Sequence, residues 1–373
     1  MVVKFTDRAV LILNILGAVA MLLAYLAPYV NPSRVVLPAL FGLAYPYILL
    51  AQLLFFCYWL IRLKREIIIP VIVILLGWNH LNNLLPLNLR SSEIPVNAPQ
   101  DRFLTALSYN VRGFNIYQWN KEAEAKKEIF DFLEAQKPQL VCFQEYYTSS
   151  QTGQTQDDIS SELQYLPFYA VFYTTDRTNR EGFGIATFSK YPIIKKSRIP
   201  FSSSLNAAMY TDIKFRSDTI RIFNIHLQSI RFQEEHYAFI DTARLKYSNE
   251  QMNEIRAIGS RLKTAFSLRA AQAQVIANYI RQSPYPVILM GDFNDTPQSY
   301  AYRKIKKGLS DAFRKSGRGF GNTYAGELPS FRIDYILYGP PFLSTDFKRS
   351  KTDYSDHYPI STRLYYPEHL NSE

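Results

Sequence analysis

Cysteine and histidine are scarce in this chain of 373 residues, which contains two cysteines and five histidines. Cys57 lies in an apolar run and Cys142 in a predicted core strand, so neither a disulfide framework nor a cysteine-based zinc site is indicated. Internal repeats and low-complexity tracts are also lacking, whereas 47% of the residues are hydrophobic and 15% are aromatic. A chain of this composition can bury a large core, which excludes intrinsic disorder as its main state.

Hydropathy and charge narrow the class of protein further. The mean hydropathy of −0.13 is too low for a chain that lies in a membrane throughout. The net charge is +10; the first hundred residues hold seven Lys/Arg and three Asp/Glu, and the rest hold 35 and 29, a net charge of +6. Such an excess suits a polyanionic partner, namely a phosphate ester, a nucleic acid or an anionic lipid surface, but a solvated basic surface explains it equally well.

Three apolar runs predict a transmembrane region over residues 1–88, with spans at about 9–30, 35–61 and 67–88. The first two runs contain 22 and 27 uncharged residues, more than the roughly 20 needed to cross a bilayer. The third weakens after Trp78, so a helix along the membrane surface is an alternative to a third span. No small-residue cleavage site follows the first run, which argues against a cleaved signal peptide.

The distribution of basic residues predicts the orientation in the membrane. Arg34 alone lies between the first two runs, and five basic residues flank them on the other side: Lys4, Arg8, Arg62, Lys64 and Arg65. The positive-inside rule therefore places the N-terminus and the second loop in the cytoplasm. Three spans would put the rest of this integral membrane protein on the extracytoplasmic, periplasmic-type side, whereas two spans would leave it in the cytoplasm. Residues 89–101 are polar, contain prolines and are expected to form a linker.

From residue 102 to residue 373, strand-like runs alternate with helical stretches, and several strands follow one another directly. This pattern favours an α/β sandwich with mixed sheets over a strictly doubly wound fold. The predicted strands cover 103–111, 139–144, 184–189, 219–226, 286–290, 332–338 and 360–365, and the predicted helices cover 121–136 and 249–282.

Six polar groups lie at or beside the ends of these strands, where a rigid scaffold can hold a site. Any one of them alone is more typical of a turn or a helix cap, but six in one domain are hard to explain as caps. The groups are Ser-Tyr-Asn110, Phe-Gln-Glu145, Asn-Ile-His226, Met-Gly-Asp292-Phe-Asn294, Arg-Ile-Asp334 and Ser-Asp356-His357.

In this order and spacing, the six groups resemble the endonuclease/exonuclease/phosphatase superfamily. The most specific motifs are Gly-Asp-Phe-Asn at 291–294 and Ser-Asp-His at 355–357. The resemblance covers about residues 103–366 and implies a four-layered α/β sandwich with two mixed sheets, here preceded by the helical transmembrane region. It suggests a membrane-anchored, bacterial-type relative of deoxyribonucleases, abasic-site endonucleases and neutral sphingomyelinases.

The resemblance implies a metal-dependent phosphoric ester hydrolase that uses Mg²⁺, with Mn²⁺ as an alternative. Phosphodiester hydrolysis needs a cation and an activated water, and hard cations prefer oxygen ligands. The expected metal ligands are Glu145, Asn110 and Asp356. A structural zinc site is not expected, because the chain lacks a cysteine cluster.

Five further residues are expected to carry out the catalysis. Asp292 would orient or deprotonate the attacking water, and Asn294 would position it. His357 would contact the phosphate, with Asp334 fixing its tautomer. His226 is expected to face the phosphate or the leaving group; the alternative is a core histidine with satisfied hydrogen bonds.

Two residues are expected to contact the substrate. Arg112 stands where abasic-site enzymes commonly carry an acid, which argues against a second metal ligand there and suggests a phosphate clamp. Tyr324, shortly before the Arg-Ile-Asp strand, is expected to line the cleft. The basic and aromatic segment 229–265 is either a lid or a solvated helical face.

Three functions follow from these observations. The favoured one is a membrane-anchored, Mg²⁺-dependent phosphoesterase that hydrolyses a lipid headgroup or another small phosphodiester by in-line attack of water. The alternative is an extracytoplasmic nuclease, for which the charge of +6 is compatible but mild. A non-catalytic scaffold would be expected to lack some of the metal and histidine positions, and none is missing. No feature indicates an obligate protein partner.

Overall fold

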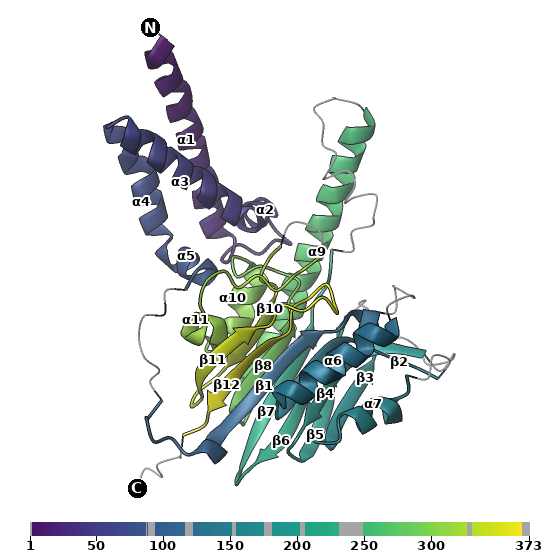
Figure 1. Cartoon of the computed structure of the whole chain (residues 1–373). Helices are drawn as coiled ribbons and strands as arrows, with labels where there is room; N and C mark the ends of the chain where they lie inside the picture. The colour runs from purple at the N-terminus through teal and green to yellow at the C-terminus, as the bar shows by residue number, and fades with distance from the viewer. Residues whose placement is uncertain are drawn as a thin grey trace. The chain divides into compact units, whose positions relative to one another are not determined.

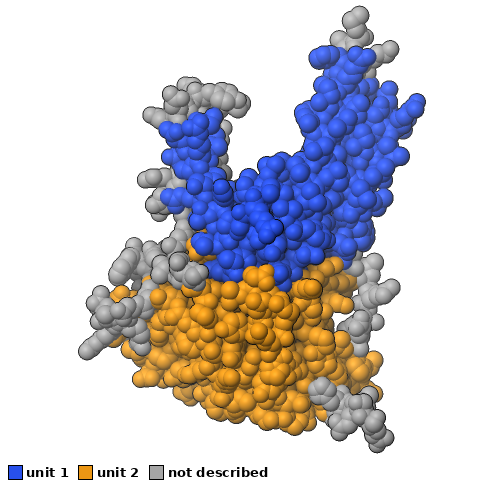
Figure 2. Space-filling view, turned by 180° about the vertical axis from the view of Figure 1, so that it is seen from behind, with its two compact units in different colours: residues 1–86, 230–273, 295–304 blue, residues 87–229, 274–294, 305–373 orange. Residues whose placement is uncertain are grey.

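The computed structural model describes residues 2–86, 88, 94–115, 122–150, 154–174, 181–201, 206–230, 249–326 and 330–367. The chain divides into two compact units, which Figure 2 shows in different colours. The first, called here the helical unit, joins residues 1–86, 230–273 and 295–304; the second, the sandwich unit, joins 87–229, 274–294 and 305–373. Residues 89–93 of the expected linker and 231–248 of the expected lid segment lie outside the described residues.

The helical unit contains the apolar N-terminal helices (Figure 1). Within the first of them, Phe5–Leu26 is long and apolar enough to cross a membrane. The second and third predicted spans are each a pair of helices, bent by 67° and 68°, so the described residues provide up to three spans if each bent pair is one. The helices are α1 (Val2–Leu26), α2 (Leu37–Leu43), α3 (Tyr45–Ile61), η1 (Arg65–Ile67), α4 (Ile68–Leu76) and α5 (Trp78–Leu84).

Buried polar side chains join α1 to α3. Asn14 Nδ2 donates a hydrogen bond to Gln52 Oε1 at 2.9 Å, and Trp59 Nε1 donates to Asn14 Oδ1 at 3.0 Å. Buried polar groups are costly unless they are hydrogen-bonded, so pairing between the helices satisfies these side chains and helps to fix the packing.

Contacts at the two ends show that α1 and α3 are antiparallel. Asp7, near the start of α1, pairs with Arg62 directly after α3, with 3.2 Å between Oδ2 and the guanidinium. Tyr25, near the end of α1, lies against Tyr45 at the start of α3, with 6.1 Å between ring centroids.

The sandwich unit is built on two six-stranded mixed sheets. Each has one parallel pair near its centre, β1–β2 in the first and β7–β8 in the second, and its other neighbours are antiparallel. The first sheet has the order β11 (Leu343–Arg349), β12 (Ile360–Tyr365), β1 (Phe103–Asn110), β2 (Leu140–Ser149), β4 (Glu181–Ser189), β3 (Phe168–Tyr173). The second has the order β5 (Ile193–Ile199), β6 (Ala208–Phe215), β7 (Asp218–His226), β8 (Val287–Asp292), β10 (Asp334–Tyr338), β9 (Ser310–Asp311).

An apolar core lies between the two sheets, because every second residue of the central strands points to the facing sheet. It includes Leu104 of β1, Ile222 of β7 and Met290 of β8. The intervening residues of the first sheet pack under helices, as where Ile129 of α6 contributes to the outer core. The remaining elements are η2 (Gln100–Arg102), η3 (Arg112–Asn115), α6 (Glu122–Gln136), α7 (Gln156–Glu162), α9 (Asn249–Arg281), α10 (Tyr300–Lys306) and α11 (Ala312–Ser316).

The predicted fold class is confirmed: two mixed sheets flanked by helices form an α/β sandwich (Figure 1). All seven predicted strands and both predicted helices are present, with ends that differ by at most five residues. The largest difference is in β2, which runs to Ser149, beyond the predicted end at residue 144.

Candidate active site

Strand periodicity carries two polar side chains of the first sheet to the space between the sheets. Asn110 lies on the same face of β1 as Leu104, and Gln144 on the same face of β2 as Cys142, both of which belong to the core between the sheets. The two polar residues are neighbours in the parallel register of β1 and β2. The apolar core between the sheets is therefore bounded by the amides of Asn110 and Gln144 where β1 ends.

A buried amide, Asn224 of β7, connects the two sheets beside these residues. Its Oδ1 accepts a hydrogen bond from Gln144 Nε2 at 2.8 Å, and its Nδ2 donates to the carbonyls of Phe143 and Ala186 at 3.1 and 2.8 Å. Because buried polar groups are costly unless they are hydrogen-bonded, this set holds the sheets at a defined spacing. The sequence predicts no role for Gln144 and Asn224 through their resemblance or position in a motif, although an amide at an inward position of an apolar strand indicates such a bond.

A β-bulge gives Glu145 its direction. The register between β2 and β4 shifts between Phe143 and Tyr146, and Glu145 has a φ of 49°. Phe143 and Tyr146 both pack in the core beneath the helices, so the bulge turns Glu145 away from that layer. Its Oε1 accepts a hydrogen bond from Asn110 Nδ2 at 3.2 Å. A positive φ at a bulky residue costs on the order of 1–3 kcal/mol and is often retained at functional sites.

Asp292 ends β8, beside His226 of β7 and Asp334 of β10. It is 1% exposed. Its Oδ1 accepts a hydrogen bond from the backbone N of Asn294 at 2.7 Å. Its Oδ2 accepts two more hydrogen bonds, from Asn110 Nδ2 at 3.0 Å and from Asn294 Nδ2 at 3.1 Å. These donors hold the carboxylate in one orientation.

The glycine before Asp292 is needed for this strand pairing. Gly291 has a φ of +147°, and a Cβ there would lie 1.9 Å from the carbonyl oxygen of Ile225 in the neighbouring strand β7. Only glycine allows both this backbone conformation and this close approach, which explains the first residue of the Gly-Asp-Phe-Asn motif.

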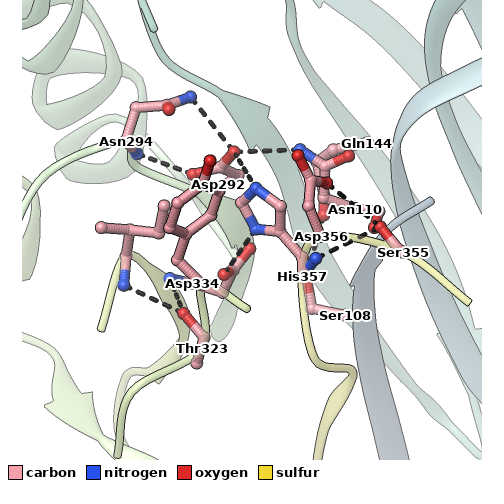
Figure 3. A network of polar contacts seen from close by, with 12 residues as sticks. Ser108, Asn110, Gln144, Asp292, Asn294, Thr323, Asp334, Ser355, Asp356 and His357 are labelled. Carbon is pink, nitrogen blue, oxygen red and sulfur yellow. Dashed lines mark hydrogen bonds and ion pairs between the residues drawn. The ribbon is translucent and has the colours of Figure 1, made fainter. Parts of the chain in front are cut away.

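His357 lies between two carboxylates, as Figure 3 shows. Its Nδ1 is 2.9 Å from Asp334 Oδ2, and its Nε2 is 3.8 Å from Asp292 Oδ2. The hydroxyl of Thr323 accepts a hydrogen bond from the backbone N–H of Asp334 at 3.0 Å. The ring of Tyr324 meets the His357 ring edge to face, with 5.4 Å between centroids, so Tyr324 lies beside His357.

His226 faces Glu145 and Asp292. Its Nε2 is 3.7 Å from Glu145 Oε1 and 3.6 Å from Asp292 Oδ2. Arg112 approaches from η3, with its Nε 3.6 Å from Asp356 Oδ2. The structure thus brings the expected residues of both sheets and their loops to one place.

Burial and charge determine which groups carry protons. Burial raises the pKa of Asp292 to about 6; Asp334 adds to this effect, and His357 and His226 oppose it. Burial alone would lower the pKa of His357, but the carboxylates of Asp334 and Asp292 outweigh it and raise that pKa well above its usual value. Burial, together with Asp356, raises the pKa of Glu145. At neutral pH the site therefore combines an ionised Asp292 with a protonated His357.

Exposure divides the site into an open and a closed part. The side chains of Glu145 and Asp356 are 33% and 24% exposed, whereas those of Asp292 and His357 are 1% and 6% exposed. Asp292, Asp334 and His357 also form a buried group whose ligand atoms lie within 4.8 Å of one another. Both parts contain atoms that bind cations.

Comparisons with known proteins agree with this architecture. Residues 107–357 match the model of the Endonuclease/Exonuclease/phosphatase family, and residues 7–84 match a domain of unknown function. An endonuclease/exonuclease/phosphatase from Bacteroides vulgatus has the same fold, with a TM-score of 0.52 and 17% identity over 70% of this chain and 98% of that chain. No curated protein matches the chain.

Two further solved structures are similar at lower scores. A family protein from Leptotrichia buccalis has a TM-score of 0.49 and 16% identity over 70% of this chain and 100% of its own. Truncated TDP2 from Caenorhabditis elegans has a TM-score of 0.47 and 15% identity over 71% of this chain and 98% of its own.

Proposed function

Because the chain belongs to the endonuclease/exonuclease/phosphatase family, whose members are generally divalent-metal-dependent hydrolases of phosphoesters, we propose that it is a membrane-anchored, Mg²⁺-dependent phosphoesterase. Its proposed substrate is a lipid headgroup or another small phosphodiester. The observation that carries this proposal is the meeting of two histidines with Asp292, at 3.6 Å from His226 and 3.8 Å from His357, beside the carboxylate of Glu145.

Glu145, Asn110 and Asp356 are the residues that would hold the cation. The carboxylate oxygens of Glu145 and Asp356 suit a hard cation, and their partial exposure leaves space for the waters that Mg²⁺ keeps. Asn110 directs its Nδ2 to Glu145, and its Oδ1 accepts a hydrogen bond from the backbone N of Arg112 at 3.1 Å, so it would have to reverse its amide to bind the ion. Burial, together with the charge of Asp356, raises the pKa of Glu145, and a bound positive ion would favour the ionised form. The bound ion would stabilise charge on a phosphoryl oxygen and lower the pKa of a coordinated water.

The buried part of the site supplies the proton chemistry. Asp292, oriented by Asn110 and Asn294, accepts the proton of the attacking water. The protonated His357, held by Asp334, stabilises negative charge on the phosphate oxygens. We assign Asp334 and His357 to this role rather than to metal binding, because they are buried and hydrogen-bonded to each other.

The alternative function is a nuclease. The charge of +6 over residues 101–373 and the position of Arg112 beside Asp356 favour a polyanionic substrate. The membrane anchor favours the lipid substrate, since it restricts the enzyme to the bilayer surface.

We place the sandwich on the extracytoplasmic side. Within the helical unit, the end of the bundle with Asp7, Arg62 and Lys64 carries the basic residues that the positive-inside rule assigns to the cytoplasm. The helices can form three spans, an odd number of crossings, so the residues that follow them would lie on the other side of the membrane. A reporter fused to the C-terminus should be active outside the cytoplasm; activity only in the cytoplasm would contradict this topology.

A substrate panel tests the function. The full-length protein in nanodiscs, with Mg²⁺, should hydrolyse phospholipid in mixed vesicles and a chromogenic phosphodiester, and Glu145→Gln should not. Asp346→Asn, at an exposed residue of the edge strand β11, is the matched control and should keep the wild-type rate. Cleavage of DNA without turnover of the other two substrates would favour the nuclease, and no turnover of any substrate with Mg²⁺ or Mn²⁺ would support the scaffold.

A further inference from the structure

The segment that follows the catalytic motif belongs to the helical unit rather than to the sandwich unit. Residues 295–304 group with the N-terminal helices, although Asp292 and Asn294 immediately before them group with the sandwich. Gln298, 2% exposed, makes two contacts with His80 of α5. Its Nε2 donates to the backbone carbonyl of His80 at 3.0 Å, and its Oε1 lies 2.5 Å from the ring Nδ1.

The His80 ring is fixed by a second helix. It stacks on the ring of Tyr25 of α1, with 4.6 Å between centroids and 23° between planes. The Tyr25 hydroxyl in turn donates to the carbonyl of Val73 of α4 at 2.8 Å. The position of Gln298 thus depends on how α1, α4 and α5 pack.

Helix α2 approaches residues 295–304 so closely that only glycine fits at the point of contact. A Cβ at Gly42 of α2 would lie 2.6 Å from the Cβ of Ala27 and 3.2 Å from the backbone oxygen of Gln298. Contact at this distance leaves the segment little room to shift.

The start of the segment is held separately. Asp295 Oδ2 lies 3.0 Å from Nε of Arg269 in α9, and the two side chains are 5% and 1% exposed. The segment is therefore fixed at Asp295 and at Gln298, with Pro297 between them limiting its backbone freedom.

We propose that His80 and Gln298 are positioning residues, through which the packing of the membrane helices sets the geometry of the catalytic loop. Asn294 is joined directly to Asp295, and both the backbone and the side chain of Asn294 orient the Asp292 carboxylate. A shift of the segment therefore moves the group that is proposed to accept the proton from water. This inference rests on the proposed function of Asp292.

Kinetics of the full-length protein in nanodiscs test the proposal. His80→Ala and Gln298→Ala should each lower kcat about tenfold with KM unchanged within about twofold, because small misplacements of catalytic groups have large effects on rate. The double variant should be no slower than either single variant, and His80→Asn, which keeps a hydrogen-bonding atom near the Nδ1 position, should recover most of the rate. Asn79→Ala, at an exposed residue of the same helix, is the matched control and should keep the wild-type kcat. A kcat near that of wild type in both single variants would overturn the proposal.

Hydrogen exchange separates this proposal from the proposed function. The amide of Asn294 bonds to Asp292, and it should exchange faster in His80→Ala and Gln298→Ala but not in Asn79→Ala. Unchanged exchange in both variants would contradict the positioning role even in an active enzyme. Faster exchange in a protein without hydrolytic activity would support the positioning role and contradict the proposed function.

Discussion

The helical unit and the sandwich unit both bury hydrogen-bonded polar side chains, but the sandwich unit also keeps some charged side chains beyond hydrogen-bond distance of one another. In the helical unit, Asn14 bonds to Gln52 and Trp59 at 2.9 and 3.0 Å, which are ordinary hydrogen-bond lengths. In the sandwich unit, the His226 and Asp292 side chains stay 3.6 Å apart. The first arrangement stabilises helix packing, and the second keeps the charged groups available to a substrate.

The largest expected effect comes from removing the charge of Asp292, at the centre of the active site in the sandwich unit. Asp292→Asn should lower kcat/KM by about 10³–10⁴-fold, since the general base is lost. The melting temperature should change little, because the loss of a buried charge stabilises the fold while the loss of one acceptor oxygen for Asn110 and Asn294 destabilises it. Hydrolysis rates give kcat/KM, and thermal unfolding of the same sample gives the melting temperature. A variant with wild-type rates would remove Asp292 from the mechanism.

The pH dependence of kcat/KM should reflect the same carboxylate. As a base, Asp292 must be ionised, so the rate should fall about tenfold per pH unit below its pKa of about 6 and level off above it. His357 must keep its proton for the reaction. Because its pKa is raised well above the usual value, the fall in rate that follows its deprotonation should appear only at alkaline pH. Asp334→Asn should move the alkaline limb to lower pH, and an unmoved limb would show that Asp334 does not control His357.

Asn224, the amide that connects the two sheets, stabilises the fold although it lies beside the active site. Asn224→Ala would leave Gln144 and two backbone carbonyls without their partner, at a cost of about 2–4 kcal/mol in the free energy of unfolding. Thermal unfolding of the full-length protein would show this as a lower melting temperature. A loss smaller than that of the exposed control Gln274→Ala would contradict the assigned role.

The smallest effect is expected in the helical unit. Asn14→Ala removes the bonds to Gln52 and Trp59, and hydrogen bonds between membrane helices contribute on average about 0.6 kcal/mol. Denaturation in mixed micelles measures the difference. A loss several times larger would mean that the helical unit depends on its polar pairs as strongly as the sandwich does.

The sequence predicts the inner strands well and the outer strands poorly. The strands not predicted are β3, β5, β6, β9 and β11, and all except β6 lie at the edges of their sheets. An edge strand has one neighbour and much exposed surface, as in Ile193–Ile199 with its two lysines, so its pattern is weak. The inner strands carry a period of two that runs from apolar residues into the site residues, as from Ile222 through Asn224 to His226.

Other features of the site depend on long-range packing that no local pattern reveals. The direction of Glu145 comes from a bulge opposite β4, and the contact of Gln298 with His80 joins residues 218 positions apart. The expected roles of Arg112 and Tyr324 in substrate binding remain predictions; the structure places Arg112 against Asp356 and Tyr324 against His357.

The proposed mechanism requires one cation at the open part of the site, next to the buried proton donors and acceptors. Mn²⁺ binding to the full-length protein in nanodiscs, followed by electron paramagnetic resonance, tests this claim without relying on turnover. We predict that the wild type and Asp334→Asn bind the ion and that Glu145→Gln loses it. Unchanged binding in Glu145→Gln, with loss in Asp334→Asn, would place the cation in the buried group and contradict the account.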